Sequence, residues 1–169
     1  RGICYATLRY FNTAGYDLNG RIQGLEKNPA NLLPIVMETA LGKRALLNVF
    51  GDNYNTPDGT GIRDYIHVTD LATAHIASLE YLRDKQKNLT LNLASGKGYS
   101  VLDVIKTAEK ITGKKIPFKI ADRREGDPSK LLAVTKFAKN KLNWDCEYSD
   151  IETILHSMWN VYNRNLVIN

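Results

Sequence analysis

Arg63 is the residue whose type and surroundings are best suited to binding chemistry in this sequence. It follows a glycine-rich turn at residues 57–61 and precedes Tyr65–Val68, a short run of β-branched and aromatic residues. A planar guanidinium beside a loop can meet the oxygens of a phosphate two at a time. The segment therefore favours an anion-binding site, and the alternative is a surface ion pair between Arg63 and Asp64.

Asn12 is a second candidate for ligand contact. It stands where the apolar segment 3–11 ends, and the ends of strands in open α/β sheets commonly carry ligand-facing amides. The alternative is that Asn12 completes a turn.

Three other patterns suggest chemistry but fail on their details. Gly96-Lys97-Gly98 half-matches a dinucleotide fingerprint, but Val101 replaces its third glycine, so we interpret it as a turn. Tyr81 and Lys85 lie one helical turn apart at a charged helix end, which favours solvation over catalysis. His67, Asp70 and His75 match no zinc spacing, so no metal is expected.

The bulk composition is that of an ordinary domain with a sizeable core. The 169 residues are 43% hydrophobic and 24% charged, with a net charge of +5 that is spread along the chain. Nucleic acid is therefore disfavoured as a partner, and a small anion suits this balance. Two cysteines make no disulfide framework or metal spacing, which points to the cytoplasm, and no window predicts a membrane span or signal peptide. The chain begins without methionine inside an apparent strand, so we expect it to be part of a longer protein.

Periodicity predicts an α/β protein. Strands are expected at 3–11, 45–51, 65–68, 89–94 and 116–120, and helices at 31–41, 69–82, 101–112, 136–142 and 151–162. Asn31 and Thr69 are the expected N-caps of the first two helices. Ser100 with Asp103, and Ser149 with Glu152, have the spacing of capping boxes.

At this point the segments resemble a known family. The matching motifs are LRYFN (8–12), NLLP (31–34), LNVFG (47–51), GTGIRDYIHVTDLATAH (59–75), LNLASGKGYSVLDV (91–104), RREGDP (123–128) and LNW (142–144). Together they resemble the UDP-glucose 4-epimerases of the extended short-chain dehydrogenase/reductase superfamily. The resemblance implies the C-terminal part of an NAD-dependent sugar-nucleotide epimerase fold, in which residues 1–13 and 65–95 join a Rossmann-type sheet. Residues 14–64 and 96–169 are expected to form a smaller mixed α/β substrate-binding domain.

The resemblance also implies roles for individual residues. Arg63 and Arg124 are expected to hold the diphosphate of a UDP-sugar, with Asn12 near the phosphate or the sugar. The remaining expected substrate contacts are Asn31 and Leu32 along the nucleotide, Asn48, Val49 and Phe50 at the uracil, and Asp127 at the ribose. Tyr10 is expected on the nicotinamide side. Leu131 matches a position that gates the sugar pocket in the family. Because leucine is intermediate in size, the resemblance does not decide whether N-acetylhexosamine substrates are accepted.

The family's reaction explains what this sequence lacks. Because the hydrogen on C4 of a hexose is not acidic, these enzymes transfer it as hydride to NAD and return it to the other face. The glycine-rich NAD loop and the catalytic Tyr/Lys pair of the family match no segment here, so no catalytic residue is expected in this chain, and the chain alone is expected to be inactive. The full enzyme is expected to be a cytoplasmic homodimer of galactose metabolism acting on UDP-glucose and UDP-galactose. The alternatives are a related NDP-sugar epimerase or dehydratase and a stand-alone, non-catalytic UDP-sugar-binding module.

Overall fold

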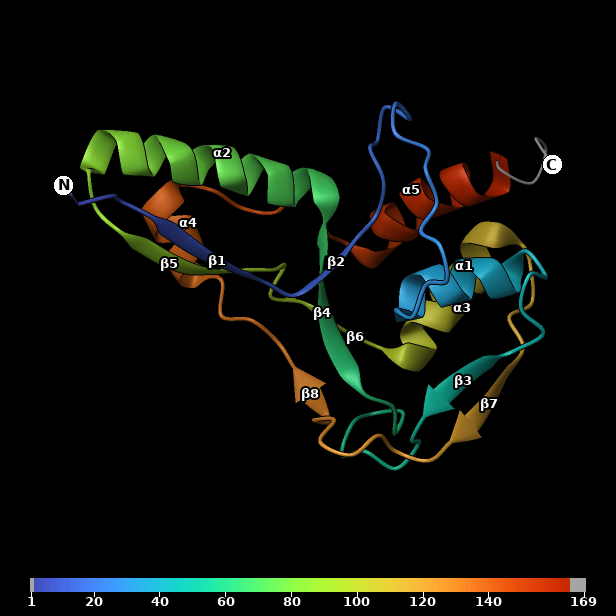
Figure 1. The fold of residues 1–169 in the computed structure, drawn as a ribbon. Helices are drawn as coiled ribbons and strands as arrows, with labels where there is room; N and C mark the ends of the chain where they lie inside the picture. The colour runs from blue at the N-terminus through green and yellow to red at the C-terminus, as the bar shows by residue number, and fades with distance from the viewer. Residues whose placement is uncertain (1, 165–169) are drawn as a thin grey trace.

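The computed structural model describes residues 2–164, in which strands and helices alternate along much of the chain (Figure 1). The strands are β1 (Ala6–Tyr10), β2 (Asn12–Ala14), β3 (Leu47–Phe50), β4 (Ile62–His67), β5 (Leu89–Leu93), β6 (Gly98–Ser100), β7 (Phe118–Ala121) and β8 (Lys130–Leu131). The helices are α1 (Leu32–Ala40), α2 (Val68–Lys85), α3 (Val101–Thr112), α4 (Lys136–Leu142) and α5 (Ile151–Arg164).

The strands of the described chain pair into small separate sheets. β1 and β5 are parallel, and so are β3 and β7. β4 is the longest strand, and it pairs in parallel with β2 and β8 and antiparallel with β6. Parallel pairs joined through helices are the arrangement of α/β proteins.

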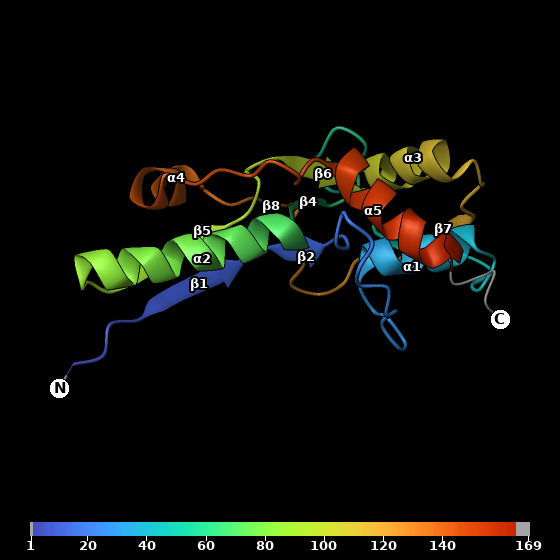
Figure 2. The same cartoon turned by 90° about the horizontal axis from the view of Figure 1, so that it is seen from above.

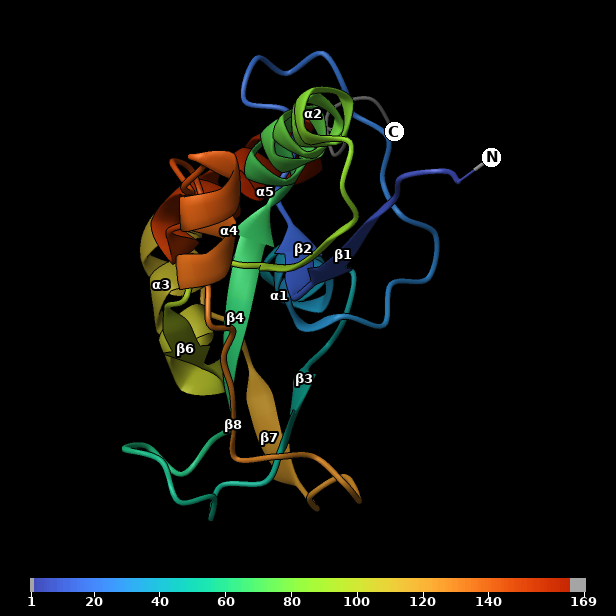
Figure 3. The same cartoon turned by 90° about the vertical axis from the view of Figure 1, so that its left-hand side faces the viewer.

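Two hydrophobic clusters lie on either side of β4. One contains residues of α1, α3 and α5 with Leu47 and Val49 of β3, and the other joins β5 to Ala74 of α2 and Ala138 of α4. Figure 2 shows α2 lying along β1 and β5 at one end of the molecule, while α1, α3 and α5 gather at the other. Figure 3 shows β4 extending between α2 and the region of β3 and β7. Residues on β4 are therefore placed where the two groups of elements meet.

Local capping explains where α3 begins and ends. The Ser100 side chain accepts from the backbone N–H of Asp103, the Asp103 carboxylate accepts from the N–H of Ser100, and Gly113 ends the helix with φ +66°. The predicted helix 101–112 is confirmed.

Two predicted N-caps were wrong. α2 begins one residue earlier than expected, because the His67 ring, and not Thr69, caps it by accepting from the N–H of Thr69 at 3.1 Å. At α5, Asp150 accepts from the N–H of Thr153, while the Ser149 hydroxyl is used by Asp70. At α5, the buried tertiary partner Asp70 accepts from the hydroxyl that local spacing had assigned to capping.

The expected strand 3–11 is divided in the structure. β1 ends at Tyr10, and the chain then enters a different sheet as β2. β1 is also less buried than a central strand, with Tyr10 52% exposed, because β5 is its one strand partner among the described residues. This division turns Asn12 away from β1 and toward β4.

Candidate functional site

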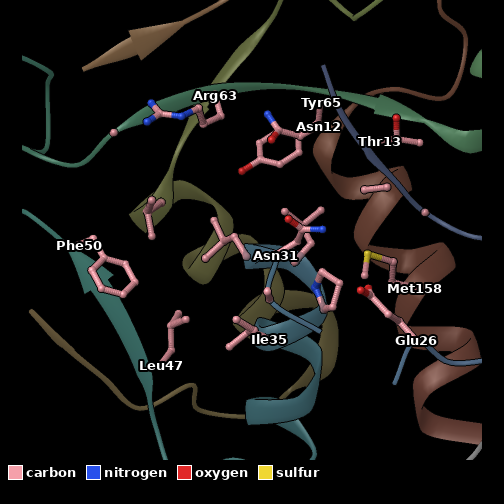
Figure 4. Close-up of a pocket in the computed structure, with 18 of the residues that line it drawn as sticks. Asn12, Thr13, Glu26, Asn31, Ile35, Leu47, Phe50, Arg63, Tyr65 and Met158 are labelled. Carbon is pink, nitrogen blue, oxygen red and sulfur yellow. The ribbon is translucent and has the colours of Figure 1, made fainter. Parts of the chain in front are cut away.

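A pocket of about 460 Å³ lies between β2, β4, β3, the start of α1 and the loop before β8. Figure 4 shows Asn12, Asn31, Phe50 and Arg63 reaching it from different elements. The sequence-predicted residues on its wall are Asn12, Asn31, Leu32, Asn48, Phe50, Arg63, Arg124 and Asp127. The fold therefore brings segments more than one hundred residues apart to one cavity.

Arg63 is fixed by its own strand and by the loop before β8. Its Nη1 donates to the carbonyls of Ile62 and Pro128, each at 2.9 Å, and its Nη2 lies 3.4 Å from Oδ1 of Asp127. The side chain keeps 19% of its surface exposed. The guanidinium is thus held in place at the pocket with donor capacity left for an anion.

Arg124 is positioned by an aromatic ring. Its Cζ lies 3.8 Å from the centroid of the Phe50 ring, which is a cation–π stack. The neighbouring Arg123 makes the same contact with Tyr54 at 3.9 Å. The loop that carries both arginines therefore rests on two aromatic rings, that of Phe50 at the end of β3 and that of Tyr54 in the segment after it.

Asn12 is oriented by β4. Its Nδ2 donates to the carbonyl of Asp64 at 2.7 Å, which leaves its side-chain oxygen available as an acceptor. The alternative interpretation, in which Asn12 completes a turn, is wrong because Asn12 lies in β2.

The Asp64 carboxylate is fully buried, and it joins β4 to two loops. It accepts from the N–H and hydroxyl of Ser95, from the N–H of Gly96 and from the N–H of Ala133, at 2.7 to 3.2 Å. It makes no ion pair with Arg63, so the expected alternative of a surface Arg63–Asp64 pair was wrong. Its role is to hold the loops that flank the site.

The start of α1 presents backbone donors to the pocket. Asn31 is the N-cap, but its side chain makes no capping hydrogen bond, and the first turn contains no acidic residue. The N–H groups of Leu32 and Leu33 belong to the first turn, whose amides have no intrahelical acceptor. Partial positive charge there suits a carbonyl or an anion.

Three expected contacts lie outside the pocket wall. Val49 is 1% exposed because it packs into the core beneath β3. Leu131, on β8, pairs in register with Arg63 of β4, and it is 45% exposed. Tyr10 stands at the end of β1, where its hydroxyl lies 3.2 Å from Nε2 of His75. The roles assigned to these three residues stay predictions.

Tyr54, Tyr65 and Glu26 line the pocket but were missed. Tyr65 carried a usable signal, because residues two apart on a strand face the same side and Arg63 had already been placed at the site. Burial raises the pKa of the Tyr65 hydroxyl well above its usual value, so it remains a neutral donor. Tyr54 and Glu26 lie in irregular segments, where spacing predicts no direction.

The segment 96–98 does not fit the pyrophosphate of a dinucleotide. Gly98 lies in β6, where a Cβ would come within 2.6 Å of both Ile62 and Leu132, so close packing explains this glycine. The start of α3 is closed by its capping box, and the Ser100 hydroxyl also donates to Asp58 at 2.5 Å. Carboxylates at this helix terminus repel phosphate, so the segment is no dinucleotide fingerprint; instead of the expected turn it forms a bend that leads into strand β6.

His67, Asp70 and His75 are each engaged elsewhere. His67 Nε2 lies 3.2 Å from the Ser157 hydroxyl, Asp70 accepts from residues 147–149, and His75 pairs with Tyr10. Within residues 2–164, no group of three or more histidine, cysteine or acidic side chains is placed to hold a metal ion. No helix in that range is long and apolar enough to cross a membrane.

These features define an α/β protein with a pocket that combines guanidinium groups, amides, helix N–H groups and an aromatic ring. The model of the NAD dependent epimerase/dehydratase family matches residues 1–94, more than half of the sequence. The chain belongs to this family.

Several of the similar proteins are named UDP-glucose 4-epimerase. A UDP-glucose 4-epimerase of Halalkalibacterium halodurans is 46% identical over 159 residues, which are 94% of this chain and 48% of that protein. The crystal structure of a UDP-glucose-4-epimerase from Stenotrophomonas maltophila, with bound NAD and formylated UDP-arabinopyranose, has a TM-score of 0.95 and 39% identity, covering 100% of this chain and 50% of that one. The crystal structure of UDP-glucose 4-epimerase from Bifidobacterium longum, in complex with NAD+ and UDP, has a TM-score of 0.88 and 41% sequence identity. The match covers 96% of this chain and 48% of that one. The chain thus spans about half the length of these relatives.

The family match corrects the expected placement within the fold. It falls on residues 1–94, where the parallel pairs β1–β5 and β2–β4 with helix α2 form an α/β, Rossmann-like region of an NAD-dependent family. The expectation of the C-terminal part of an epimerase fold was wrong, and that placement is withdrawn. The division into a Rossmann-type part and a substrate-binding part stays a prediction.

NAD is confirmed as the cofactor of the family, and relatives are solved with it bound. In this chain, the glycine-rich segment 96–98 does not fit its pyrophosphate, for the reasons given above. No chemical step is therefore assigned to NAD through residues of this chain.

Proposed function

We propose that this chain is the UDP-sugar-binding portion of a UDP-glucose 4-epimerase. The observation that carries the proposal is the pocket that Arg63 lines together with Arg124, whose guanidinium stacks on the Phe50 ring. Two fixed cations suit two phosphates, and a ring beside them suits a base. The names of the relatives support the same ligand class.

Each lining residue has a role in this proposal that its geometry permits. Arg63 and Arg124 bind the diphosphate, and the Phe50 ring and the exposed Asn48 meet the uracil. The free N–H groups at the start of α1 bind a carbonyl or phosphate oxygen. Asp127 accepts from ribose hydroxyls at one edge of the pocket, and the free oxygen of Asn12 accepts from a sugar hydroxyl.

The complete enzyme interconverts the C4 epimers UDP-glucose and UDP-galactose. Bound NAD supplies the hydride acceptor and donor for the C4 hydrogen. The residues of this chain hold the nucleotide and thereby position the sugar relative to the bound NAD. Such positioning contributes to catalysis by fixing the orientation of the reacting groups. We infer that the chain by itself does not epimerise, because its sequence contains no Gly-x-x-Gly-x-x-Gly segment and its one Tyr-x-x-x-Lys pair lies at the exposed end of α2.

The proposal is tested by two measurements on the chain of residues 1–169. In isothermal titration calorimetry, UDP-glucose and UDP are expected to bind to this chain. With NAD supplied, UDP-galactose shows no turnover. Failure of UDP-glucose to bind would overturn the binding function, and measurable turnover would overturn the inactivity of the chain.

The family resemblance also supports a homodimeric, cytoplasmic enzyme of galactose metabolism as the complete protein. The native mass of the complete protein tests the dimer, since a single-chain mass at micromolar concentration would contradict it.

A further inference from the structure

The pocket carries opposite charges on two of its sides. Its charged wall residues are Glu26, Arg63, Arg124 and Asp127. Asp127 lies 3.4 Å from Arg63, and its N–H donates to the carbonyl of Arg124 at 3.3 Å, so these three residues form one group. Figure 4 shows Glu26 on the far side of the cavity from Arg63 and Phe50. The group with two guanidiniums has a positive balance, and Glu26 makes the far side negative.

The Glu26 carboxylate is available to a ligand. The residue is exposed and lies in the loop between β2 and α1. Figure 4 shows its carboxylate pointing toward the cavity, on the side where Thr13 and Met158 also lie. Within residues 2–164 this carboxylate makes no hydrogen bond and no ion pair. Its oxygens therefore keep their full capacity to accept hydrogen bonds from ligand hydroxyls.

The other polar groups on this side are uncharged. The Thr13 hydroxyl donates to the carbonyl of Phe11 at 3.3 Å and keeps its lone pairs, and Asn12 keeps its side-chain oxygen. Burial raises the pKa of the Tyr16 hydroxyl, and the negative charge of Glu26 adds to that shift, so Tyr16 is a neutral neighbour of Glu26. Among the described wall residues, no lysine or arginine lies here to balance a negative ligand. This side suits the hydroxyl groups of a sugar.

The proposed diphosphate site determines where the sugar of a ligand lies. With the base at Phe50 and the diphosphate at the guanidinium groups, the sugar extends from the phosphates away from the ring. Figure 4 shows Asn12 on that path, between Arg63 and Thr13. A neutral hexose brings hydroxyls to the Glu26 carboxylate, whereas a uronic acid brings a second carboxylate. Two like charges in a partly enclosed site repel each other.

We propose that Glu26 determines which sugar the pocket accepts, favouring nucleotide diphosphates of neutral sugars and rejecting those of uronic acids. The inference rests on the proposed function and narrows it to a class of sugar. Glu26 lies outside every motif that carries the family resemblance, so its role comes from the charge distribution of this pocket. The same residue would separate a hexose epimerase from a related enzyme that acts on uronates.

Calorimetry with UDP, UDP-glucose and UDP-glucuronate tests the proposal. The unaltered chain is expected to bind UDP-glucose about tenfold more tightly than UDP-glucuronate. Glu26→Gln keeps the shape and one acceptor oxygen but removes the charge, so the two affinities are expected to differ by less than about threefold, through tighter binding of UDP-glucuronate. Glu80→Gln is the matched control, because it removes the same charge from an exposed position on α2, and it should keep the preference for UDP-glucose.

The outcomes separate this inference from the proposed function. If the unaltered chain does not bind UDP, both fail. If it binds UDP but binds UDP-glucuronate as tightly as UDP-glucose, or if the preference persists in Glu26→Gln, only the role of Glu26 is overturned. A gain in UDP affinity in Glu26→Gln as large as the gain for UDP-glucuronate would show that the carboxylate acts on the phosphates, and would overturn its assignment to the sugar.

Discussion

The Arg124 guanidinium lies 3.8 Å from the centroid of the Phe50 ring, on the wall of the same pocket. This stack joins β3 to the loop before β8 and couples two functions that sequence motifs treat separately. The ring that would meet a base is also the surface that positions a cation for a phosphate. Recognition of the two halves of a nucleotide is therefore expected to be cooperative at this pair.

Replacing the ring tests that coupling. Phe50→Leu removes the stacking surface and frees Arg124, so the affinity for UDP is expected to fall by about tenfold or more, as the loss of one stacked base would give. Calorimetry measures the change, and Phe118→Leu is the matched control on β7, outside the pocket. Equal UDP affinity in Phe50→Leu and the unaltered chain would show that Phe50 neither stacks on the base nor positions Arg124.

The buried Asp64 carboxylate is expected to dominate the stability of the site's framework. Asp64→Asn keeps the shape but places an amide NH₂ against N–H donors, so we expect the free energy of unfolding to fall by about 2–4 kcal/mol. Urea denaturation followed by circular dichroism measures it. Asp122→Asn, at an exposed position, should change the free energy of unfolding by less than about 0.5 kcal/mol. A loss in Asp64→Asn as small as in the control would contradict the assigned role.

His67 is expected to make stability depend on pH. Burial lowers the pKa of His67 below its ordinary value of 6.5, although Asp70 and Asp150 oppose this shift. Below pH 6.5 the unfolded chain therefore binds a proton that the folded chain does not, and the free energy of unfolding decreases as pH falls, by at most about 1.4 kcal/mol per unit.

Urea denaturation at pH 7.5 and pH 5.5 checks this dependence above the range where carboxylates titrate. The decrease should be smaller in His67→Gln than in the unaltered chain and should persist in His156→Gln, whose side chain is exposed. The same decrease in all three proteins would exclude His67 as its source.

Local signals predicted the elements that local interactions determine. The ends of α3 followed from Ser100, Asp103 and Gly113, whose effects act within one helical turn. The face of α2 was not predictable in this way. Leu79 is apolar but 66% exposed, whereas Asp70, Ala74 and Ser78 are buried. Small side chains let α2 approach its neighbours closely, and the Asp70 carboxylate accepts hydrogen bonds from backbone N–H groups distant in sequence. Hydrophobic periodicity predicts neither effect.

The site was predicted in part for a similar reason. Motifs placed Arg63, Phe50 and Arg124 at one ligand, and all three reach the pocket. Tyr54 lines the pocket but was missed because it lies in an irregular segment, where spacing predicts no side-chain direction. Val49 stands between Asn48 and Phe50, and strand alternation turns its side chain into the core, so its expected ligand contact stays a prediction.

The central claim is that this pocket binds a nucleotide diphosphate through Arg63 and Arg124. The most direct measurement is calorimetric titration of UDP and of uridine into the unaltered chain and into the Arg63→Gln/Arg124→Gln variant. The account predicts that UDP binds at least about tenfold more tightly than uridine to the unaltered chain, and that this advantage disappears in the variant. An equal affinity for UDP and uridine in the unaltered chain, or an advantage that persists without both guanidinium groups, would contradict it.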